Sequence, residues 1–145
     1  MKGTVVDRKY NERRDSIHIP PDAGEYTDGL VAIMMRIPDG WGRWISCDKG
    51  WYSIIIDVDQ RLCELDPIYS LHQVKEKFGG LRYYFEPTAT TDHETLEKMQ
   101  QIVRDAEARA KQTCECCGST EQVALRKHGW WKNMCDKCDQ AKRSG

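Results

Sequence analysis

Two stretches of the chain place apolar residues at the three- and four-residue steps of an amphipathic helix. The first covers about residues 49–65, with Asp48 suited to cap its start. The second covers about residues 92–112, where Thr91 and Glu94 can form a capping box. The apolar positions are Trp51, Ile54, Ile55, Val58, Leu62 and Leu65 in the first helix and Leu96, Met99, Val103, Ala106 and Ala110 in the second. Each helix is therefore predicted to bury one face.

Between the two predicted helices, the segment LHQVKEKFGGLRYYFEP has the pattern of a β-hairpin. Gly79 and Gly80 can adopt the positive φ angles of a two-residue turn, and pairing Phe78 with Leu81 then sets the register. One face of this hairpin carries Val74, Glu76, Phe78, Leu81, Tyr83 and Phe85, and the other carries Lys75, Lys77, Arg82 and Tyr84. The first face is predicted to pack on the core, and the second to be basic and exposed.

The N-terminal part of the chain gives a weaker pattern. Residues 1–28 are polar and show neither a helical nor a strand period. The apolar run from Leu30 to Ile37, between Gly29 and Pro38, fits a short helix or a strand equally well. The predicted fold class is α+β, with two amphipathic helices and an antiparallel hairpin sheet. The predicted units are a partly irregular N-terminal arm at 1–43, an α+β core domain at 44–112 and a four-cysteine finger at 113–145.

Four of the seven cysteines form two C-x-x-C pairs near the end of the sequence. Cys114 and Cys117 make the first pair, Cys135 and Cys138 make the second, and 17 residues separate the pairs. This spacing is typical of zinc sites with four thiolate ligands. Four thiolates complete a tetrahedron and leave no position open for water, so the predicted Zn²⁺ is structural and not catalytic.

The residues between the two pairs predict the shape of the finger. Gly118 occupies a position of a zinc knuckle that favours a left-handed backbone, which supports Cys117 as the ligand although Cys116 could replace either neighbouring cysteine. The segment VALRKHGWWKNM can form a hairpin that turns near His128 and Gly129, and DQAKRSG can form a short terminal helix. A knuckle, a hairpin and a helix are the parts of a treble-clef finger.

Composition and charge narrow the functional classes. The 145 residues carry a formal net charge of −1 with 31% charged residues, which argues against tight, nonspecific coating of DNA. The first residues, MKGTVVDRKYNERRD, lack the apolar core of a signal peptide, and no apolar run approaches the roughly 20 residues of a membrane span. A cytoplasmic protein without membrane contact is therefore expected. In a reducing compartment, cysteines at ligand spacing are expected to bind metal and not to form disulfides.

A local basic surface remains in spite of the low net charge. Residues 114–145 hold six basic and four acidic side chains, a formal +2, which leaves −3 for residues 1–113. We expect the basic hairpin face to hold phosphates of a nucleotide or nucleic acid while a tryptophan stacks on a base. The candidate ligand-binding residues are Lys75, Lys77, Arg82, Tyr84, Trp130 and Trp131. A solvated strand face without a ligand is an equally good interpretation of the hairpin residues.

Catalytic alternatives find less support in the sequence. Treble-clef nucleases of the HNH type need histidines on the strand and helix of the finger, and this finger contains only His128. Most of the carboxylates Asp57, Asp59, Glu64 and Asp66 fit the solvated face of the first helix better than an active site. No catalytic residue is therefore predicted, and a non-enzymatic binding protein is expected.

Three segments of the sequence, which span about residues 44–138, form a recognisable set: WISCDKGWYSIIIDVDQRLCEL, QVKEKFGGLRYYF and the cysteine pairs with GWWKNMCDKC. Together they resemble small, mostly uncharacterised proteins encoded by bacteriophages and bacterial genomes. The resemblance implies a phage or prophage setting and brings with it no established activity or catalytic residue. In that setting, a counter-defence or host-takeover role is expected, in which the protein sequesters a nucleotide or blocks a host protein.

A host protein is thus the second kind of expected partner. Tryptophan is a common anchor of protein interfaces, and Trp41, Trp44, Trp130 and Trp131 are candidates for such exposed anchors. Trp51 and one of the two finger tryptophans are expected to lie in the core instead. Binding of nucleic acid by the finger, and less favoured nuclease activity, are the remaining alternatives.

Overall fold

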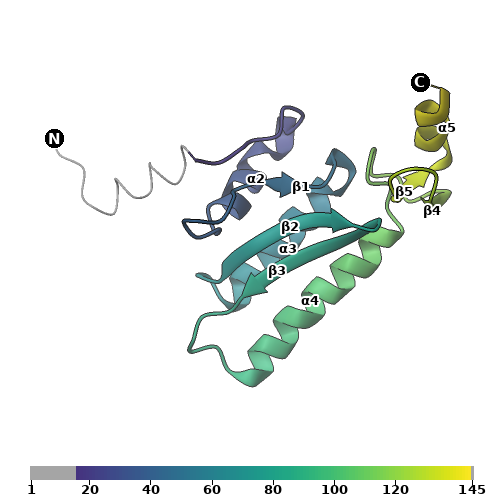
Figure 1. Ribbon diagram of the computed structural model, residues 1–145. Coiled ribbons are helices and arrows are strands. Elements are labelled where there is room, and N and C mark those ends of the chain that lie inside the picture. Colours follow the sequence, from purple (N-terminus) through teal and green to yellow (C-terminus); the bar gives the residue numbers. More distant parts are fainter. Residues whose placement is uncertain (1–15, 145) are drawn as a thin grey trace.

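The computed structural model describes residues 16–144 of the chain (Figure 1). Residues 1–15 of the expected N-terminal arm lie outside the described residues. The elements of the described part are the short 3-10 helices η1 Gly24–Tyr26 and η2 Lys49–Trp51, the helices α2 Thr27–Met34, α3 Tyr52–Leu65, α4 His93–Lys111 and α5 Asp136–Ser144, and the strands β1 Ile45–Ser46, β2 Ser70–Lys77, β3 Gly80–Glu86, β4 Val123–Arg126 and β5 Lys132–Cys135. The predicted α+β class is confirmed.

The larger sheet has the strand order β1-β2-β3 and carries the hydrophobic core on one face. β1 pairs with β2 in parallel, and β2 pairs with β3 in antiparallel orientation. Helices α3 and α4 pack against each other and lie along this sheet, as Figure 1 shows. Their apolar stripes meet the inward side chains of the strands in one cluster, whose fully buried members include Trp51, Leu62, Leu71, Leu81 and Met99.

The apolar run from Leu30 to Ile37 is helical. α2 ends at Met34, and the chain turns before Ile37. Leu30, Ile33, Met34 and Ile37 are fully buried in the same cluster as α3 and α4. These four positions recur at steps of three, one and three residues, which is the spacing of one helix face. The second half of the expected N-terminal arm therefore contributes to the core.

The hairpin of β2 and β3 is confirmed, but its turn begins one residue earlier than predicted. Lys77 pairs with Gly80, so Phe78 and Gly79 form the two-residue turn, with φ angles of 54° and 82°. Positive φ at both central residues is the geometry that suits the twist of a two-residue hairpin. The predicted pairing of Phe78 with Leu81 is wrong, because Leu81 pairs with Glu76.

The predicted faces of the hairpin survive this error because the register shifts by an even number of residues. Val74, Leu81 and Tyr83 are buried, while Tyr84 is exposed on the other face. Phe78 is the exception, since it lies in the turn with 69% of its surface exposed and takes no part in the core.

Two predicted helix caps are wrong. Asp48 precedes η2, but its side chain makes no capping hydrogen bond and pairs with Lys132 of the finger instead. Asp92, and not Thr91, caps α4, because its Oδ1 accepts a hydrogen bond from the amide of Thr95 at 2.7 Å. The hydroxyl of Thr91 instead contacts the hydroxyl of Thr88 and donates a hydrogen bond to Asp66.

Two of the four carboxylates in and after α3, most of which were expected on a solvated helix face, are buried. Asp59 accepts hydrogen bonds from Tyr69 Oη and from Arg36 Nε. The hydroxyls of Tyr69 and Tyr83 lie 2.7 Å apart and extend this network across the sheet. Asp66 accepts hydrogen bonds from the loop before α4. Each buried carboxylate thus has hydrogen-bond partners, and these offset the free-energy cost of removing its charge from water.

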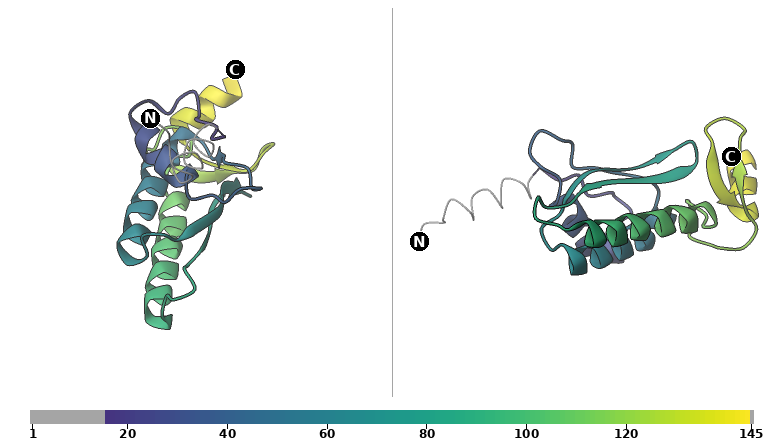
Figure 2. Two further views of the ribbon diagram at one scale, coloured as in Figure 1. Left: turned by 90° about the vertical axis from the view of Figure 1, so that its left-hand side faces the viewer. Right: turned by 90° about the horizontal axis from the view of Figure 1, so that it is seen from below.

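The finger packs against the tip of the hairpin and the start of η2. Figure 2 shows the hairpin pointing toward the finger, which lies beyond the end of α4. The amide of Gly50 donates to the carbonyl of Glu115 at 2.7 Å, and Asn133 Nδ2 donates to the carbonyl of Gly79 at 2.6 Å. The indole of Trp51 in the core also donates to the finger, at the carbonyl of residue 113. The two parts are therefore joined by backbone hydrogen bonds as well as side chains.

At Gly50 the backbone of the core lies close to the backbone of the finger. A Cβ at Gly50 would lie 2.1 Å from the carbonyl oxygen of Cys114 and 2.5 Å from that of Glu115. Glycine allows this approach because it has no Cβ. Beside it, the amide of Asp48 donates to Glu115 Oε2 at 3.0 Å.

Candidate metal centre and adjoining groove

The cysteines of the two C-x-x-C pairs come together in one cluster. The Sγ atoms of Cys114, Cys117, Cys135 and Cys138 all lie within 4.8 Å of one another, and those of Cys117 and Cys135 are 3.7 Å apart. Bonds of about 2.3 Å from zinc to sulfur place the corners of a tetrahedron about 3.8 Å apart, so this donor set fits a four-coordinate metal ion. The predicted set of four ligands thus forms a candidate metal site.

A different element positions each sulfur of the cluster. Cys114 follows the end of α4, Cys117 lies in the next turn, Cys135 ends β5 and Cys138 lies in the first turn of α5. The amide of Gly118 closes the turn by donating to the carbonyl of Cys114 at 2.8 Å. The φ angle of Gly118 is 85°, which confirms the left-handed backbone predicted there.

Burial, backbone amides and the neighbouring thiols shift the pKa values of the clustered cysteines. Burial alone would raise the pKa of Cys114, but hydrogen bonds from the backbone of Cys135, Cys117 and Cys116 lower that pKa to about 7. Burial and the hydrogen bonds with the other three thiols raise the pKa of Cys138. Four thiolates this close repel one another, and a bound cation would remove the repulsion.

Cys116 lies outside the cluster. It is half-buried, and burial raises the pKa of its thiol to about 11. Cys116 does not replace Cys114 or Cys117 in the donor set, because its sulfur is not among the four that lie within 4.8 Å of one another. All seven cysteines, which lie within residues 16–144, are free of disulfide bonds.

The apolar interior of the finger is small. Its buried cluster consists of Cys114, Met134 and Cys135, with Val123 among the partly buried residues that pack against it. So few large apolar groups cannot offset the conformational entropy of ordering about 30 residues. The order of the finger therefore depends on the cysteine cluster and on docking to the core.

The strands β4 and β5 form the predicted second hairpin, and α5 the predicted terminal helix. Charged side chains brace the hairpin against α5. Arg126 Nη2 donates to Asp136 at 2.7 Å, and His128 Nε2 lies 2.7 Å from Asp139 Oδ1. Arg143 Nη2 lies 3.2 Å from the other ring nitrogen of His128. Both nitrogens of His128 thus contact neighbouring side chains, and its ring acts as a brace within the finger.

A groove of about 580 Å³ lies between the tip of the first hairpin and the loop of the finger hairpin. We call it the aromatic groove, and its lining residues are Lys75, Glu76, Lys77, Phe78, Gly129, Trp130 and Trp131. Its size is within the range of small-molecule sites. Four of the six candidate ligand-binding residues, Lys75, Lys77, Trp130 and Trp131, therefore lie together although they come from the hairpin and the finger.

The aromatic rings of this groove are exposed and held in place. Trp130 is 70% exposed and Trp131 40% exposed, so the expectation that one of them is a core residue is wrong. Glu76 accepts from Trp130 Nε1 at 2.6 Å with one carboxylate oxygen and from the amide of Gly79 at 2.7 Å with the other. The ring of Trp131 meets that of Phe78 edge-on, with centroids 6.1 Å apart.

Positive charge surrounds these rings. Lys127 Nζ lies 4.6 Å from the centroid of Trp131, and Lys77 Nζ lies 5.8 Å from that of Phe78. The only acid in the lining, Glu76, has both oxygens in the hydrogen bonds that fix the groove. An electron-rich, flat and anionic molecule is the chemical class that this lining complements.

The other two candidate residues lie beside the groove. Arg82 lines an adjoining hollow of about 310 Å³ together with Lys77 and Lys111. Tyr84 lines neither space, and its ring centroid is 5.9 Å from Lys75 Nζ. Phe78, Lys111 and Lys127 were not among the predicted site residues. Phe78 had been assigned to the core, and no sequence pattern links α4 or the finger loop to the tip of the hairpin.

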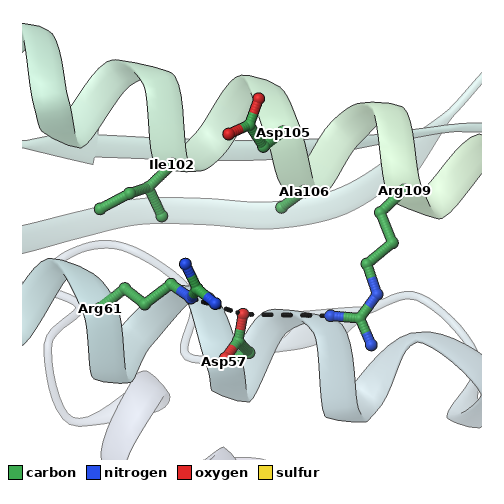
Figure 3. A pocket seen from close by; sticks show the side chains of 6 residues that line it. All are labelled: Asp57, Arg61, Ile102, Asp105, Ala106 and Arg109. Carbon is green, nitrogen blue, oxygen red and sulfur yellow. Dashed lines mark ion pairs between the residues drawn. The ribbon is translucent and has the colours of Figure 1, made fainter.

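A smaller hollow between α3 and α4 offers no comparable site. Figure 3 shows Asp57 between two arginines, with its Oδ2 3.0 Å from Arg61 Nε and 4.0 Å from Arg109 Nη1. The space measures about 140 Å³, and the charges around Asp57 are already paired. This hollow is explained by the packing of two charged helix faces.

Two further exposed tryptophans lie outside the finger. Trp41 stacks on the ring of His72 with centroids 5.0 Å apart, and Trp44 stacks on the ring of His18 at 3.6 Å. Both indoles have just over half of their surface exposed, as expected for interface anchors.

In comparisons with known proteins, no family model, no curated protein and no solved structure matches the chain. Within residues 16–144, none of the helices combines the length and apolar character needed to cross a bilayer.

Proposed function

We propose that this protein is a non-enzymatic binding protein that holds an anionic nucleotide-like ligand in the aromatic groove. The observation that carries the proposal is that exposed indole rings and lysines from two separate parts of the chain line one space. A nucleobase can stack on Trp130 or Trp131, while Lys75 and Lys77 neutralise its phosphates. Because Glu76 fixes one of the indoles, little ordering is needed when the ligand binds.

The second part of the proposal is that the metal is Zn²⁺ and that the finger is a treble clef. Support comes from four sulfurs at tetrahedral spacing, a glycine turn, a hairpin and a helix in that order. Zinc would hold the finger loop, and hence one wall of the groove, in place. Elemental analysis of protein purified under reductant should find one zinc per chain, and a Cys135→Ser variant should lose it. Wild-type protein without metal would refute this assignment.

Ligand binding can be tested through the fluorescence of the groove tryptophans. A panel of nucleoside monophosphates and diphosphates should quench the emission saturably. A Trp130→Ala/Trp131→Ala variant lacks these fluorescent reporters, so its affinity is measured by isothermal titration calorimetry beside wild type. It should bind about 5- to 150-fold more weakly, since stacking on one base contributes about 1–3 kcal/mol. Lys75→Glu/Lys77→Glu should abolish binding through charge repulsion.

Trp44→Ala is the matched control, because it removes an indole of intermediate exposure, between those of Trp130 and Trp131, from a different surface. It should leave affinity unchanged. Equal losses in the groove variants and in the control, or no saturable quenching by any nucleotide, would contradict the proposal.

Blocking of a host protein is the second candidate function, and the exposure of Trp41 and Trp44 favours it. Under this function, Trp41→Ala/Trp44→Ala should abolish the co-purification of one defined bacterial protein, whereas Trp130→Ala/Trp131→Ala should not. The reverse pattern would assign the partner to the aromatic groove.

The resemblance of the hairpin and finger segments to phage and prophage proteins supports a counter-defence or host-takeover role in the bacterial cytoplasm as the setting of this proposal. Expression of the protein in a bacterium with an active defence system should restore phage plaques, and the groove variants should fail to do so. Metal-dependent cleavage of nucleic acid that disappears in His128→Ala would instead favour the nuclease alternative.

A further inference from the structure

We infer that the ligand is a single-stranded nucleic acid several nucleotides long and not a mononucleotide. This inference rests on the proposed function of the aromatic groove, and it comes from the hollow beside that groove. The hollow, which we call the basic hollow, is lined by Lys77, Phe78, Gly79, Gly80, Arg82, Lys111, Leu125 and Asn133. Lys77 and Phe78 line both spaces, so the two adjoin at the tip of the first hairpin.

The lining of the basic hollow contains three cations and no carboxylate. Lys77 and Arg82 come from the two strands of the hairpin, and Lys111 is the last residue of α4. Arg82 Nη1 makes one hydrogen bond, to the carbonyl of Leu81, which leaves other donors of the guanidinium available. Glu107 on α4 interacts electrostatically with both Arg82 and Lys111 and reduces the local excess to about two charges.

The two spaces differ in the chemistry that they offer. The aromatic groove offers three aromatic side chains beside two lysines, whereas the basic hollow offers three cations with Phe78 as its one aromatic side chain. A single nucleotide needs no second phosphate site. A chain that stacks its bases in the groove would carry its next phosphates past Phe78 toward Arg82 and Lys111, and a positive track beside stacking rings is the usual arrangement of single-strand binding proteins.

A double helix fits this surface less well than a single strand. Bases in a duplex stack on one another, so they cannot also stack on the indoles of Trp130 and Trp131 without being unpaired. The turn of the first hairpin separates the two spaces, and an unpaired, flexible backbone can bend around it. We therefore expect little dependence on base sequence and a strong dependence on strand length.

The test compares thymidine monophosphate with an oligothymidine and an oligouridine of about ten nucleotides, by tryptophan quenching at several salt concentrations. At least one oligomer should bind about tenfold or more tightly than the monophosphate. Arg82→Gln/Lys111→Gln should weaken oligomer binding, reduce its log–log salt slope by about 0.7 for each lost phosphate contact, and leave monophosphate binding unchanged.

Lys98→Gln/Arg61→Gln is the matched control, because it removes one lysine and one arginine from exposed helix positions away from the groove. Equal affinity for monophosphate and oligomers would overturn the inference and leave the proposed function standing. Absence of binding to every probe would overturn both. Equal weakening by the control, or equal binding of a duplex of the same length, would mean that nonspecific charge attraction accounts for the binding.

Discussion

The junction between the core and the finger can be tested with one methyl group, in the variant Gly50→Ala. The added Cβ would lie 2.1 Å from the carbonyl oxygen of Cys114 and 2.5 Å from that of Glu115. Both clashes involve backbone atoms, so no side chain can rotate away to relieve them. The finger must therefore move away from η2, and the hydrogen bond from Gly50 to Glu115 would be lost or stretched.

The magnitude follows from three contributions. Forced overpacking costs about 1–3 kcal/mol. The lost backbone hydrogen bond costs about 1 kcal/mol. Replacing glycine by alanine at an ordinary φ angle returns about 0.4–1 kcal/mol, because the unfolded chain becomes less flexible. The net expectation is a destabilisation of about 1–3.5 kcal/mol, whereas a glycine-to-alanine change without clashes would stabilise the protein.

Thermal unfolding of the metal-loaded protein measures this effect. A loss of about 1–3.5 kcal/mol corresponds to roughly 3–12 °C in Tm for a chain of this size. Gly80→Ala is the control, since the closest atom to its added Cβ is Arg82 Nη1 at 3.0 Å, at the end of a flexible side chain. A Tm of Gly50→Ala equal to or above that of wild type would show that the finger is not held as closely as described.

Three more predictions address the metal, a buried acid and the core network. Chelation of the metal under reducing conditions should remove amide-exchange protection from β4, β5 and α5 while α3 stays protected; full protection of the strands would refute the structural role of the metal. Burial raises the pKa of Glu115 to about 7 from an ordinary 4.5. The folded state therefore binds this proton more tightly, and its contribution to stability is present at low pH and declines as pH rises toward 7. The Tm advantage of Glu115→Gln over wild type should grow between pH 5 and 7 and then level off, and a constant difference would contradict the shift. Asp59→Leu should destabilise the protein by about 3–5 kcal/mol in urea unfolding, because it leaves Arg36 and Tyr69 without their buried partner, whereas a change below about 1 kcal/mol would mean that the network is dispensable.

The sequence predicted those features whose signal lies in local spacing. The two C-x-x-C pairs and Gly118 predicted the cluster and its turn, because the ligand geometry restricts which residues can stand between cysteines. The faces of β2 and β3 were also predictable, since alternation by two is insensitive to an even shift of register. The turn itself was misplaced because a pair of glycines is the stronger signal, while the structure places Phe78 at a positive φ.

Features that depend on distant contacts could not be predicted. Asp59 lies at the edge of the apolar stripe of its helix, four residues after Ile55 and three before Leu62. No local pattern indicates that the hydroxyls of Tyr69 and Tyr83 join it in a buried network. The aromatic groove joins residues more than 50 positions apart, as the hydrogen bond from Trp130 to Glu76 illustrates. No pattern within either segment indicates that they meet.

Phe78 adopts a backbone conformation that is unfavourable for a bulky residue, and its position in the groove can explain why it is there. A bulky side chain at a φ of 54° is disfavoured by roughly 1 kcal/mol relative to glycine. Phe78→Gly should therefore relax the turn and raise the melting temperature, and at the same time remove a ring from the meeting point of the two spaces. The variant should thus be more stable than wild type but bind its ligand more weakly. In wild type, the first hairpin would then be less stable than it could be because it presents an aromatic ring to the ligand.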